Sequence, residues 1–395
     1  MSLPEQEILN STISRFFQIE DITTGDNKDG YLVRYRGKMT TSDIPAAYDS
    51  LAENLRPHKV TPLFRKDDQG THIIFITDGI IEPQPSRISI NIIMLILTII
   101  SVMFTGAQMS ATEMPPDAAG QILASLKNIF SGAPFALALL SILGAHELGH
   151  YFAGRYHKTA VTLPYFIPLP LSLLGTMGAF IQLKDFPKNK RHLLDIGIAG
   201  PLAGLIIAIP VLLIGLSLSE IGPIQQTQGG FIEGNSLLYL AAKYITFHQL
   251  LPAPASYDGM SPILYWLRYF FTGSPIPYGG TDVLIHPVAL AGWAGILVTA
   301  INLIPAGQLD GGHIMYVLFG KRLRYAYPII LTILLIMGYF WNGWWLWVGL
   351  LLLFGRNYAE PLDQITELDP ARRILAICAI LIFIIVFTPV PIALM

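Results

Sequence analysis

The stretch GAPFALALLSILGAHELGHYFAG, residues 132–154, decides the fold of this chain. It is long and apolar enough to cross a bilayer as a helix, which takes about 20 residues, yet it carries His146, Glu147 and His150. Each ionisable side chain at the centre of a spanning helix costs about 2.5 to 3.5 kcal/mol. A bound metal ion can return roughly 10 kcal/mol or more. We therefore interpret the stretch as a spanning helix with a metal site, rather than as a helix with two packed interior histidines.

The composition of the whole chain agrees with a membrane protein. Of its 395 residues, 52% are hydrophobic and 13% are charged, and the mean hydropathy of +0.52 is high for a soluble protein of this length. The net charge of -2, without a long run of Lys or Arg, gives no reason to expect nucleic acid as a partner. The single cysteine, Cys378, excludes an internal disulfide, so any metal must be held by His and carboxylates.

Residues 1–86 are polar and mixed in charge, and we expect them to form a small soluble α+β domain. The sequence predicts a helix at 44–55 and strands in three runs, 31–37, 61–67 and 71–78. The N-terminus lacks the basic flank and short apolar core of a cleaved signal peptide, so we expect the first span itself to direct insertion. A proline-containing linker at 82–87 leads into the membrane domain, residues 87–395.

Seven apolar windows meet or approach the length of a membrane span. They begin at Ile88, Ala133, Leu193, His286, Tyr325, Trp344 and Ile374. The loops after the second and fourth windows are rich in Lys and Arg, which keeps short loops on the cytoplasmic side, whereas acidic residues predominate in 220–285. We therefore predict a polytopic α-helical membrane protein with about seven spans, a cytoplasmic N-terminal domain, and residues 220–285 outside.

His146 and His150 share one face of a helix, and Glu147 stands beside the first of them, next to where a bound water would lie. Two histidines leave a zinc ion short of a third protein ligand. Asp310 is the candidate, because it is a carboxylate enclosed on both sides by apolar sequence. His146 and Asp310 precede basic residues by nine and eleven positions, so each lies roughly 15 Å from the cytoplasmic surface. The alternative for Asp310 is a carboxylate at a helix end.

Residues 161–183 are apolar but interrupted by prolines and glycines, which suits a re-entrant β-hairpin. A cytoplasmic loop resting on the bilayer is the alternative. The edge of such a hairpin can pair with an extended substrate by strand addition. The residues predicted to form this edge are Gly178, Ala179, Phe180, Ile181 and Gln182.

Three further features have structural interpretations. Asn302 and Pro305 predict a kink just before Asp310, where Asn302 can satisfy a freed backbone group. Gly200 and Gly204 form a GxxxG pair, which predicts close helix packing. Two amphipathic segments in the outer loop, 235–247 and 262–271, either cap the bundle or gate substrate entry.

HELGH at 146–150 and NLIPAGQLDGG at 302–312 together resemble the paired motifs of the intramembrane metalloproteases of the site-2 protease type, peptidase family M50. The resemblance covers a catalytic core of about 133–320, including IAGPLAG at 198–204. It is nearest to the plastid and bacterial branch that carries an N-terminal soluble domain and has no PDZ insertion.

The resemblance implies that His146, His150 and Asp310 bind one Zn²⁺ per chain and that Glu147 is the catalytic base. It also implies that Asn302 hydrogen-bonds the substrate near the zinc. The hairpin would belong to a membrane-associated sheet, and the substrate would be a membrane-spanning helix that is cut within or near the bilayer.

We therefore expect a multi-pass zinc endopeptidase, in the plasma membrane of a prokaryote rather than in an organelle membrane. Its expected partners are membrane-anchored protein substrates and the lipid bilayer. A metal-ion or proton transporter is the alternative, because it also uses buried His, Glu and Asp, and a non-catalytic binding protein is a third. The sequence leaves open the oligomeric state and the role of the N-terminal domain.

Overall fold

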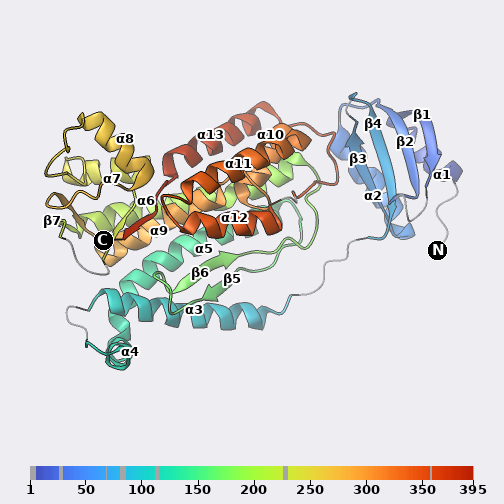
Figure 1. The fold of residues 1–395 in the computed structure, drawn as a ribbon. Coiled ribbons are helices and arrows are strands. Elements are labelled where there is room, and N and C mark those ends of the chain that lie inside the picture. Colours follow the sequence, from blue (N-terminus) through green and yellow to red (C-terminus); the bar gives the residue numbers. More distant parts are fainter. Residues whose placement is uncertain are drawn as a thin grey trace.

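A computed structural model describes residues 6–25, 30–67, 69–80, 86–111, 115–225, 230–355 and 358–394, and the side chains of all of these except Phe354 and Leu394. The sheet domain of the N-terminal residues lies at one end, a bundle of helices follows, and short helices and strands cover the other end of the bundle (Figure 1). Residues 82–85 of the predicted linker lie outside the described residues.

The N-terminal domain is an antiparallel sheet in the order β1-β2-β4-β3, with two helices on one face. The strands are β1 (Phe17–Thr24), β2 (Val33–Met39), β3 (Val60–Lys66) and β4 (His72–Asp78), and the helices are α1 (Gln6–Ile13) and α2 (Ile44–Leu55). Alternating strand residues such as Tyr35, Phe64 and Ile74 are fully buried against the helices. The helix predicted at 44–55 and the three predicted strands are confirmed, whereas β1 was not predicted.

The edge strand β3 forms hydrogen bonds between this domain and the membrane part. The Phe64 N–H donates to the carbonyl of Leu362, and the Gln364 N–H donates to the carbonyl of Phe64, both at 3.0 Å. On its other side, the same short segment donates from the Asp363 N–H to the carbonyl of Lys188 at 2.7 Å. The segment therefore lies between the edge of the sheet and the residues that lead into helix α6.

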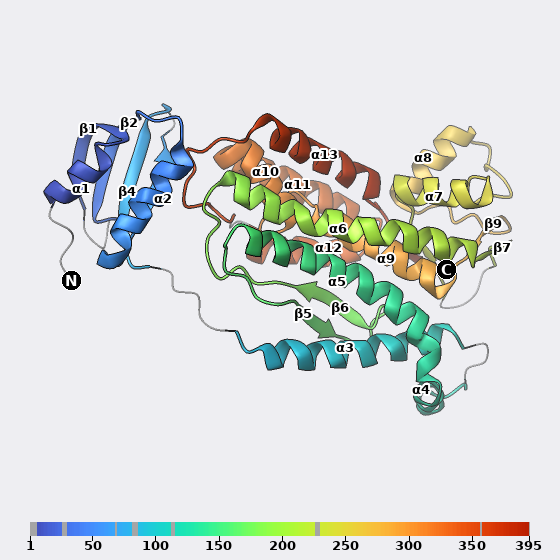
Figure 2. The same ribbon diagram turned by 180° about the vertical axis from the view of Figure 1, so that it is seen from behind.

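Three of the described helical segments are long and apolar enough to cross a membrane. They are α3 (Ile88–Met109), α5 (Ala133–Tyr156), which a 3₁₀ turn extends back to Ile129, and α6 (Lys190–Ser217). The short helix α4 (Ala118–Lys127) connects α3 to α5 (Figure 2). Helices α5 and α6 lie side by side along much of their length, and both contribute to the largest buried apolar cluster.

The predicted number of seven spans is not confirmed. The described residues after 286 form five shorter α-helices, α9 (Pro287–Asn302), α10 (Asp310–Phe319), α11 (Leu323–Met337), α12 (Gly343–Phe354) and α13 (Pro370–Val386). A hydropathy window counts apolar residues whether or not the helix through them is continuous. The predicted kink is a full interruption between α9 and α10, because Pro305 lacks an N–H and Gly307 has a φ of +60°.

The hairpin predicted within 161–183 is present as the antiparallel strands β5 (Tyr165–Pro168) and β6 (Thr176–Phe180). Two polar side chains of α3 hold it. The Asn91 Nδ2 donates to the carbonyls of Leu163 and Pro164, and the Ser101 Oγ donates to the carbonyl of Gly175. The hairpin therefore packs against a helix of membrane-spanning length instead of extending away from the bundle.

We call the described part of residues 220–285 the outer cap, after the side of the membrane that the sequence predicts for it. It contains β7 (Glu220–Pro223) paired with β9 (Thr281–Leu284), β8 (Phe231–Glu233) paired with the C-terminal β10 (Ile392–Leu394), and helices α7 (Leu237–Phe247) and α8 (Pro262–Thr272). The two helices match the amphipathic segments seen in the sequence, whereas the strands were not predicted. Lys243 is completely buried in the cap, with its Nζ 2.9 Å from Asp282 Oδ1 and 3.8 Å from Glu233 Oε1.

Candidate metal centre

Two histidines of α5 and the first residue of α10 converge at one point. The Nε2 atoms of His146 and His150 lie 3.2 Å apart, and they are 3.4 and 3.3 Å from the Oδ2 atom of Asp310. All three side chains are largely buried. One helical turn separates the two histidines, so both imidazoles leave α5 on the same face. The break between α9 and α10 places Asp310 at a helix start that faces them.

These separations fit a tetrahedral metal ion. Two ligand atoms that each lie about 2.0 to 2.1 Å from a zinc ion, at a tetrahedral angle, are about 3.3 to 3.4 Å apart. The three measured separations, 3.2, 3.3 and 3.4 Å, agree with that value. Among the described residues, these three form one group of side chains able to hold a metal. Two imidazoles and a carboxylate also leave one coordination position open for a water or a substrate.

The ligand imidazoles are held by neighbouring groups. The His150 Nδ1 lies 2.7 Å from the carbonyl oxygen of Ile196, which accepts its proton and leaves Nε2 free to bind an ion. The Nδ2 of Asn302, at the end of α9, lies 3.2 Å from His146 Nε2. The structure therefore brings Asn302 to the metal centre, and the residues before the α9 break contact the ligands directly.

Two glycines of α6 leave the space that the imidazoles occupy. A Cβ atom added at Gly200 would lie 2.0 Å from His150 Nε2, and one at Gly204 would lie 3.2 Å from His146 Nδ1. The GxxxG pair does allow close helix packing, as predicted. The two glycines pack against the side chains of His150 and His146. This role could not be inferred from the spacing of the glycines alone.

Glu147 lies in the same cavity as the ligands. This cavity has a volume of about 230 Å³, and Glu147, His146, His150, Asp310 and Asn302 are among the residues that line it. The Glu147 side chain is buried, and Ile181, the residue after β6, lines the same cavity. The residues after β6 therefore lie beside the carboxylate that the sequence predicted as the base.

The five residues predicted as a substrate-binding edge do not all reach the metal centre. Ala179, Phe180 and Ile181 line the cavity. Gly178 instead has a φ of +109°, and its N–H donates to a threonine hydroxyl within the hairpin. The Gln182 N–H donates to the Thr162 hydroxyl, and its carbonyl accepts from the Thr162 N–H. Only the middle part of the predicted edge faces the ligands.

Two polar cavity residues were missed in the sequence. Gln308 and His313 both line the metal cavity. His313 stands one turn after Asp310 on α10, and its Nδ1 is buried without a hydrogen-bond partner among the described residues. The i, i+3 spacing from a ligand could have identified it, because such residues share a helix face. Gln308 lies in the irregular segment between α9 and α10, for which no periodicity exists.

The chain is similar to plant proteins that are named as zinc metalloproteases. It is 28% identical over 333 residues to "Probable zinc metalloprotease EGY1, chloroplastic" of Oryza sativa subsp. japonica, covering 78% of this chain and 52% of that protein. It is 27% identical over 332 residues to the Arabidopsis thaliana protein of the same name, covering 78% and 55%. This chain thus spans about half the length of these relatives. No solved structure matches it.

These relatives correct one expectation. The protein was expected to lie in the plasma membrane of a prokaryote. That expectation is wrong, because the matched proteins are chloroplastic proteins of plants, which points to an organelle membrane. The physical reason for the error is that hydropathy and the distribution of Lys and Arg report spans and their orientation. Neither property identifies the membrane in which the spans lie.

The profile of peptidase family M50 matches residues 134–340, more than half of the chain. The matched region contains α6, α9 and α10 and all of α5 except its first residue. It therefore includes both helices whose side chains converge on the candidate metal centre, and it confirms the resemblance that HELGH and NLIPAGQLDGG indicated. The chain belongs to peptidase family M50.

Proposed function

We propose that this chain is a zinc-dependent endopeptidase that hydrolyses peptide bonds of membrane-spanning substrate helices. The observation that carries the proposal is the convergence of two imidazoles and a carboxylate at separations of 3.2 to 3.4 Å, with Glu147 in the same cavity. The names of the relatives support zinc as the ion. The described residues contain one group of side chains able to hold it, which supports one site per chain.

His146, His150 and Asp310 would hold the ion. A bound zinc supplies a Lewis acid that polarises the scissile carbonyl and lowers the pKa of a water in its open position. Glu147 takes a proton from the attacking water and delivers it to the leaving amine. The Glu147 side chain is buried in the cavity that the three ligands also line. The apolar residues around the cavity limit the access of bulk water, which strengthens each polar interaction within it.

The substrate must present an extended backbone, because a peptide bond inside a helix is shielded by its own hydrogen bonds. We infer that the middle of the predicted edge, residues 179–181, receives it by strand addition. The support is that Ala179, Phe180 and Ile181 line the metal cavity, and that β6 is paired with β5 on one side only among the described strands. Asn302 would position the substrate chain beside the ion, since its amide already lies at the ligands.

We infer about seven membrane crossings in the chain. Helices α9 and α10 together would make one interrupted crossing, which is tolerated where the irregular backbone lines a protein cavity. Helices α11, α12 and α13 would each cross once, although α12 has only 12 residues and needs a locally thinned bilayer. The N-terminal domain, residues 1–86, would lie on the side of the basic loops. Membrane-impermeant labelling of cysteines introduced in the outer cap and in β1 would test this orientation.

A metal-ion or proton transporter is not favoured by the structure. Transport needs polar groups along a path through the bilayer. The described residues able to hold a metal gather at one point, and the part of α5 on the other side of the ligands buries Phe135, Leu139 and Ile142. An isolated ionic site enclosed by apolar side chains suits chemistry at a fixed position.

Reconstitution of the purified chain in vesicles with synthetic spanning helices tests the proposed function. We expect cleavage within the apolar segment, loss of cleavage with a chelator, and recovery when Zn²⁺ is added. Mass spectrometry of the products gives the position of the cut. A zinc-loaded chain that leaves a broad panel of spanning helices uncut would contradict the proposal.

A further inference from the structure

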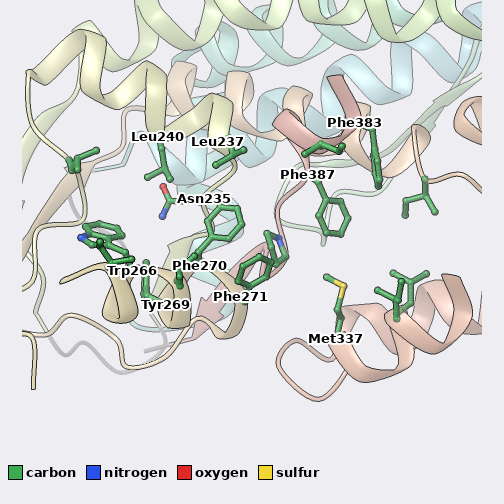
Figure 3. A pocket seen from close by; sticks show the side chains of 18 of the residues that line it. Asn235, Leu237, Leu240, Trp266, Tyr269, Phe270, Phe271, Met337, Phe383 and Phe387 are labelled. Atoms are coloured by element: carbon green, nitrogen blue, oxygen red, sulfur yellow. The ribbon is translucent and has the colours of Figure 1, made fainter. Parts of the chain in front are cut away.

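A large groove between the outer cap and the last helices contains none of the groups that the proposed reaction uses. Its volume is about 890 Å³, and Phe271 of α8 and Met337 of α11 are among its walls (Figure 3). Its lining is almost entirely apolar, and it shares no residue with the cavity at the metal centre. The polar side chains able to act on a peptide bond lie instead in the smaller cavity of about 230 Å³.

Most polar side chains of the metal cavity already have a role. Three are the candidate ligands, Glu147 is the proposed base, and Asn302 contacts a ligand imidazole. Gln308 and His313 remain. The Gln308 side chain is exposed, so its amide is open to water, whereas His313 is half-buried. His313 is therefore the enclosed polar group of the cavity that the mechanism has not yet used.

His313 is held beside the ligands without being one of them. Among the described residues, the group of side chains able to hold one ion does not include it. Its N–H donates to the carbonyl of Leu309 at 3.1 Å in the first turn of α10. On the side of α6, a Cβ atom added at Gly197 would lie 3.3 Å from the His313 Cβ. The stem of the side chain thus packs against α6, and its ring lines the cavity.

The two ring nitrogens of His313 lie in different surroundings. Nδ1 is buried and has no hydrogen-bond partner, whereas Nε2 is neither bonded nor fully buried in the part of the chain that the structure describes. A neutral imidazole has one N–H donor and one acceptor nitrogen. A buried N–H without an acceptor is rare in proteins. The proton therefore belongs on Nε2, which makes His313 a hydrogen-bond donor toward the cavity.

We propose that the Nε2–H of His313 donates a hydrogen bond to the oxygen of the scissile carbonyl and stabilises the negative charge that develops there. The inference rests on the proposed function. When the water oxygen bonds to the carbonyl carbon, the π electron pair moves to the carbonyl oxygen, and the water proton passes to Glu147. When the C–N bond breaks, that pair returns to the carbonyl, and the amine nitrogen takes the proton from Glu147. His313 keeps its own proton throughout.

A donor fixed in advance at this position acts on the transition state more than on the bound substrate, because the oxygen carries more charge there. His313→Phe removes the donor and keeps a ring. We expect kcat to fall about 10²- to 10³-fold, the usual effect of losing one such donor, while KM stays within about threefold. The variant should retain one zinc per chain, since His313 is not among the three converging side chains.

Two further variants separate loss of the donor from loss of a packed side chain. His313→Gln offers an amide N–H near the position of Nε2 and should recover about tenfold or more of the lost kcat. His192→Phe is the matched control. The Nδ1 of His192 is likewise buried without a partner among the described residues, but His192 stands at the start of α6 and does not line the metal cavity. Its kcat should stay within about twofold of the wild-type value.

Binding of a phosphinic peptide with the sequence around the cut gives a readout that does not depend on turnover. Its tetrahedral phosphorus and charged oxygens imitate the transition state, so in His313→Phe its Kd should rise by about the factor by which kcat/KM falls. The Kd of an uncut substrate, measured in a Glu147→Gln background, should change by less than about threefold. Equal changes in both Kd values would indicate a general loss of substrate binding and overturn the proposal.

Nitrogen-15 spectra of the zinc-loaded wild type, labelled at histidine, read the tautomer directly. The signals that disappear in His313→Gln assign the residue, and we expect a bare Nδ1 and a protonated Nε2. A proton on Nδ1, a kcat of His313→Phe within about threefold of wild type, or loss of zinc from that variant would each overturn the proposal. A wild type that cuts no spanning helix would instead contradict the proposed function, so the two failures are distinguishable.

Discussion

The Nε2 atom of His150 on α5 lies 3.3 Å from the Oδ2 atom of Asp310, the first residue of α10. These two helices are far apart in the sequence, and the irregular segment after α9 aligns the second with the first. An ion held between them would cross-link two parts of the bundle. Binding of the ion to the folded state alone would therefore stabilise that state, as any such ligand does.

Asp310→Asn should weaken zinc binding by more than the roughly 10- to 100-fold that loss of a neighbouring, non-ligating residue causes. The reason is that the amide lacks the negative charge of the carboxylate while keeping its size. Metal analysis after dialysis against a weak chelator measures the effect. Glu220→Gln, at the exposed first residue of β7, removes a carboxylate elsewhere and should retain one zinc per chain. A stoichiometric zinc content in the Asp310 variant would exclude Asp310 as a ligand.

Glu147→Gln should lower kcat by about 10² to 10⁴, the usual effect of losing a general base. Zinc binding should be unchanged, because Glu147 is not among the three converging ligands. Glutamine has nearly the size and shape of glutamate, so the local structure is kept. Cleavage rates and zinc content measured on one preparation separate the two effects. A variant that cuts within about tenfold of the wild-type rate would rule out Glu147 as the base.

Gly200→Ala should abolish zinc binding. The added methyl group would lie 2.0 Å from His150 Nε2, so either the imidazole or α6 must move. Gly144→Ala is the matched control, because Gly144 is on α5 and a Cβ there has open space within 4 Å. Gly204→Ala should have an intermediate effect, since its nearest contact is 3.2 Å. Equal zinc affinities in the Gly200 and Gly144 variants would contradict this prediction. They would show that α5 and α6 move apart freely enough to accommodate the added methyl group.

The three candidate ligands could be predicted from the sequence to lie together, because their chemistry is costly in a membrane. Two histidines one turn apart in an apolar helix, and one enclosed carboxylate, have few explanations other than a shared ion. The role of Gly200 could not be predicted, because the sequence does not show which helix packs against which face. His313 was within reach, since it stands one turn after Asp310 on the same helix.

The fold was predicted where local pattern determines it. The helix at 44–55 and three strands of the N-terminal sheet follow their own periodicity and were predicted, whereas β1 was missed. The pairing of β8 with β10 joins segments that are far apart in the sequence, and the strands are only three residues long, too short to carry a pattern. The number of spans is not confirmed for a different reason, since the apolar window from His286 contains a break that hydropathy does not register.

Arg65→Ala should loosen the N-terminal domain from the membrane part. The Arg65 guanidinium donates to the carbonyls of Pro361 and Leu362 at 3.1 and 2.8 Å, and burial lowers its pKa, which indicates an enclosed site. Loss of such a charged hydrogen bond costs about 2 kcal/mol, so opening of the contact should increase about 30-fold.

Hydrogen exchange at the amides of Phe64 and Gln364 measures this opening, because both amides bond across the contact. Arg36→Ala is the control, since the half-exposed Arg36 pairs with Asp67 within the N-terminal domain. Its exchange rates at the contact should match those of the wild type. Unchanged exchange in the Arg65 variant would mean that the backbone bonds alone hold the domain.

Glu233 makes the stability of the outer cap depend on pH. Burial raises the pKa of its carboxyl above the ordinary value of 4.5, and the nearby Asp282 adds to the rise, while Lys243 opposes it. Because the folded state binds this proton more tightly than the unfolded state, the contribution of Glu233 to stability is greatest at low pH. It falls as the pH rises from about 4.5 through the raised pKa.

Glu233→Gln should remove that slope and keep the bond that the Tyr239 hydroxyl donates. Thermal unfolding from roughly pH 5 to 8 compares the two chains, with the exposed-site variant Glu220→Gln expected to retain the wild-type slope. Parallel pH profiles for the wild type and the Glu233 variant would show that the buried Lys243 keeps both carboxylates ionised throughout this range.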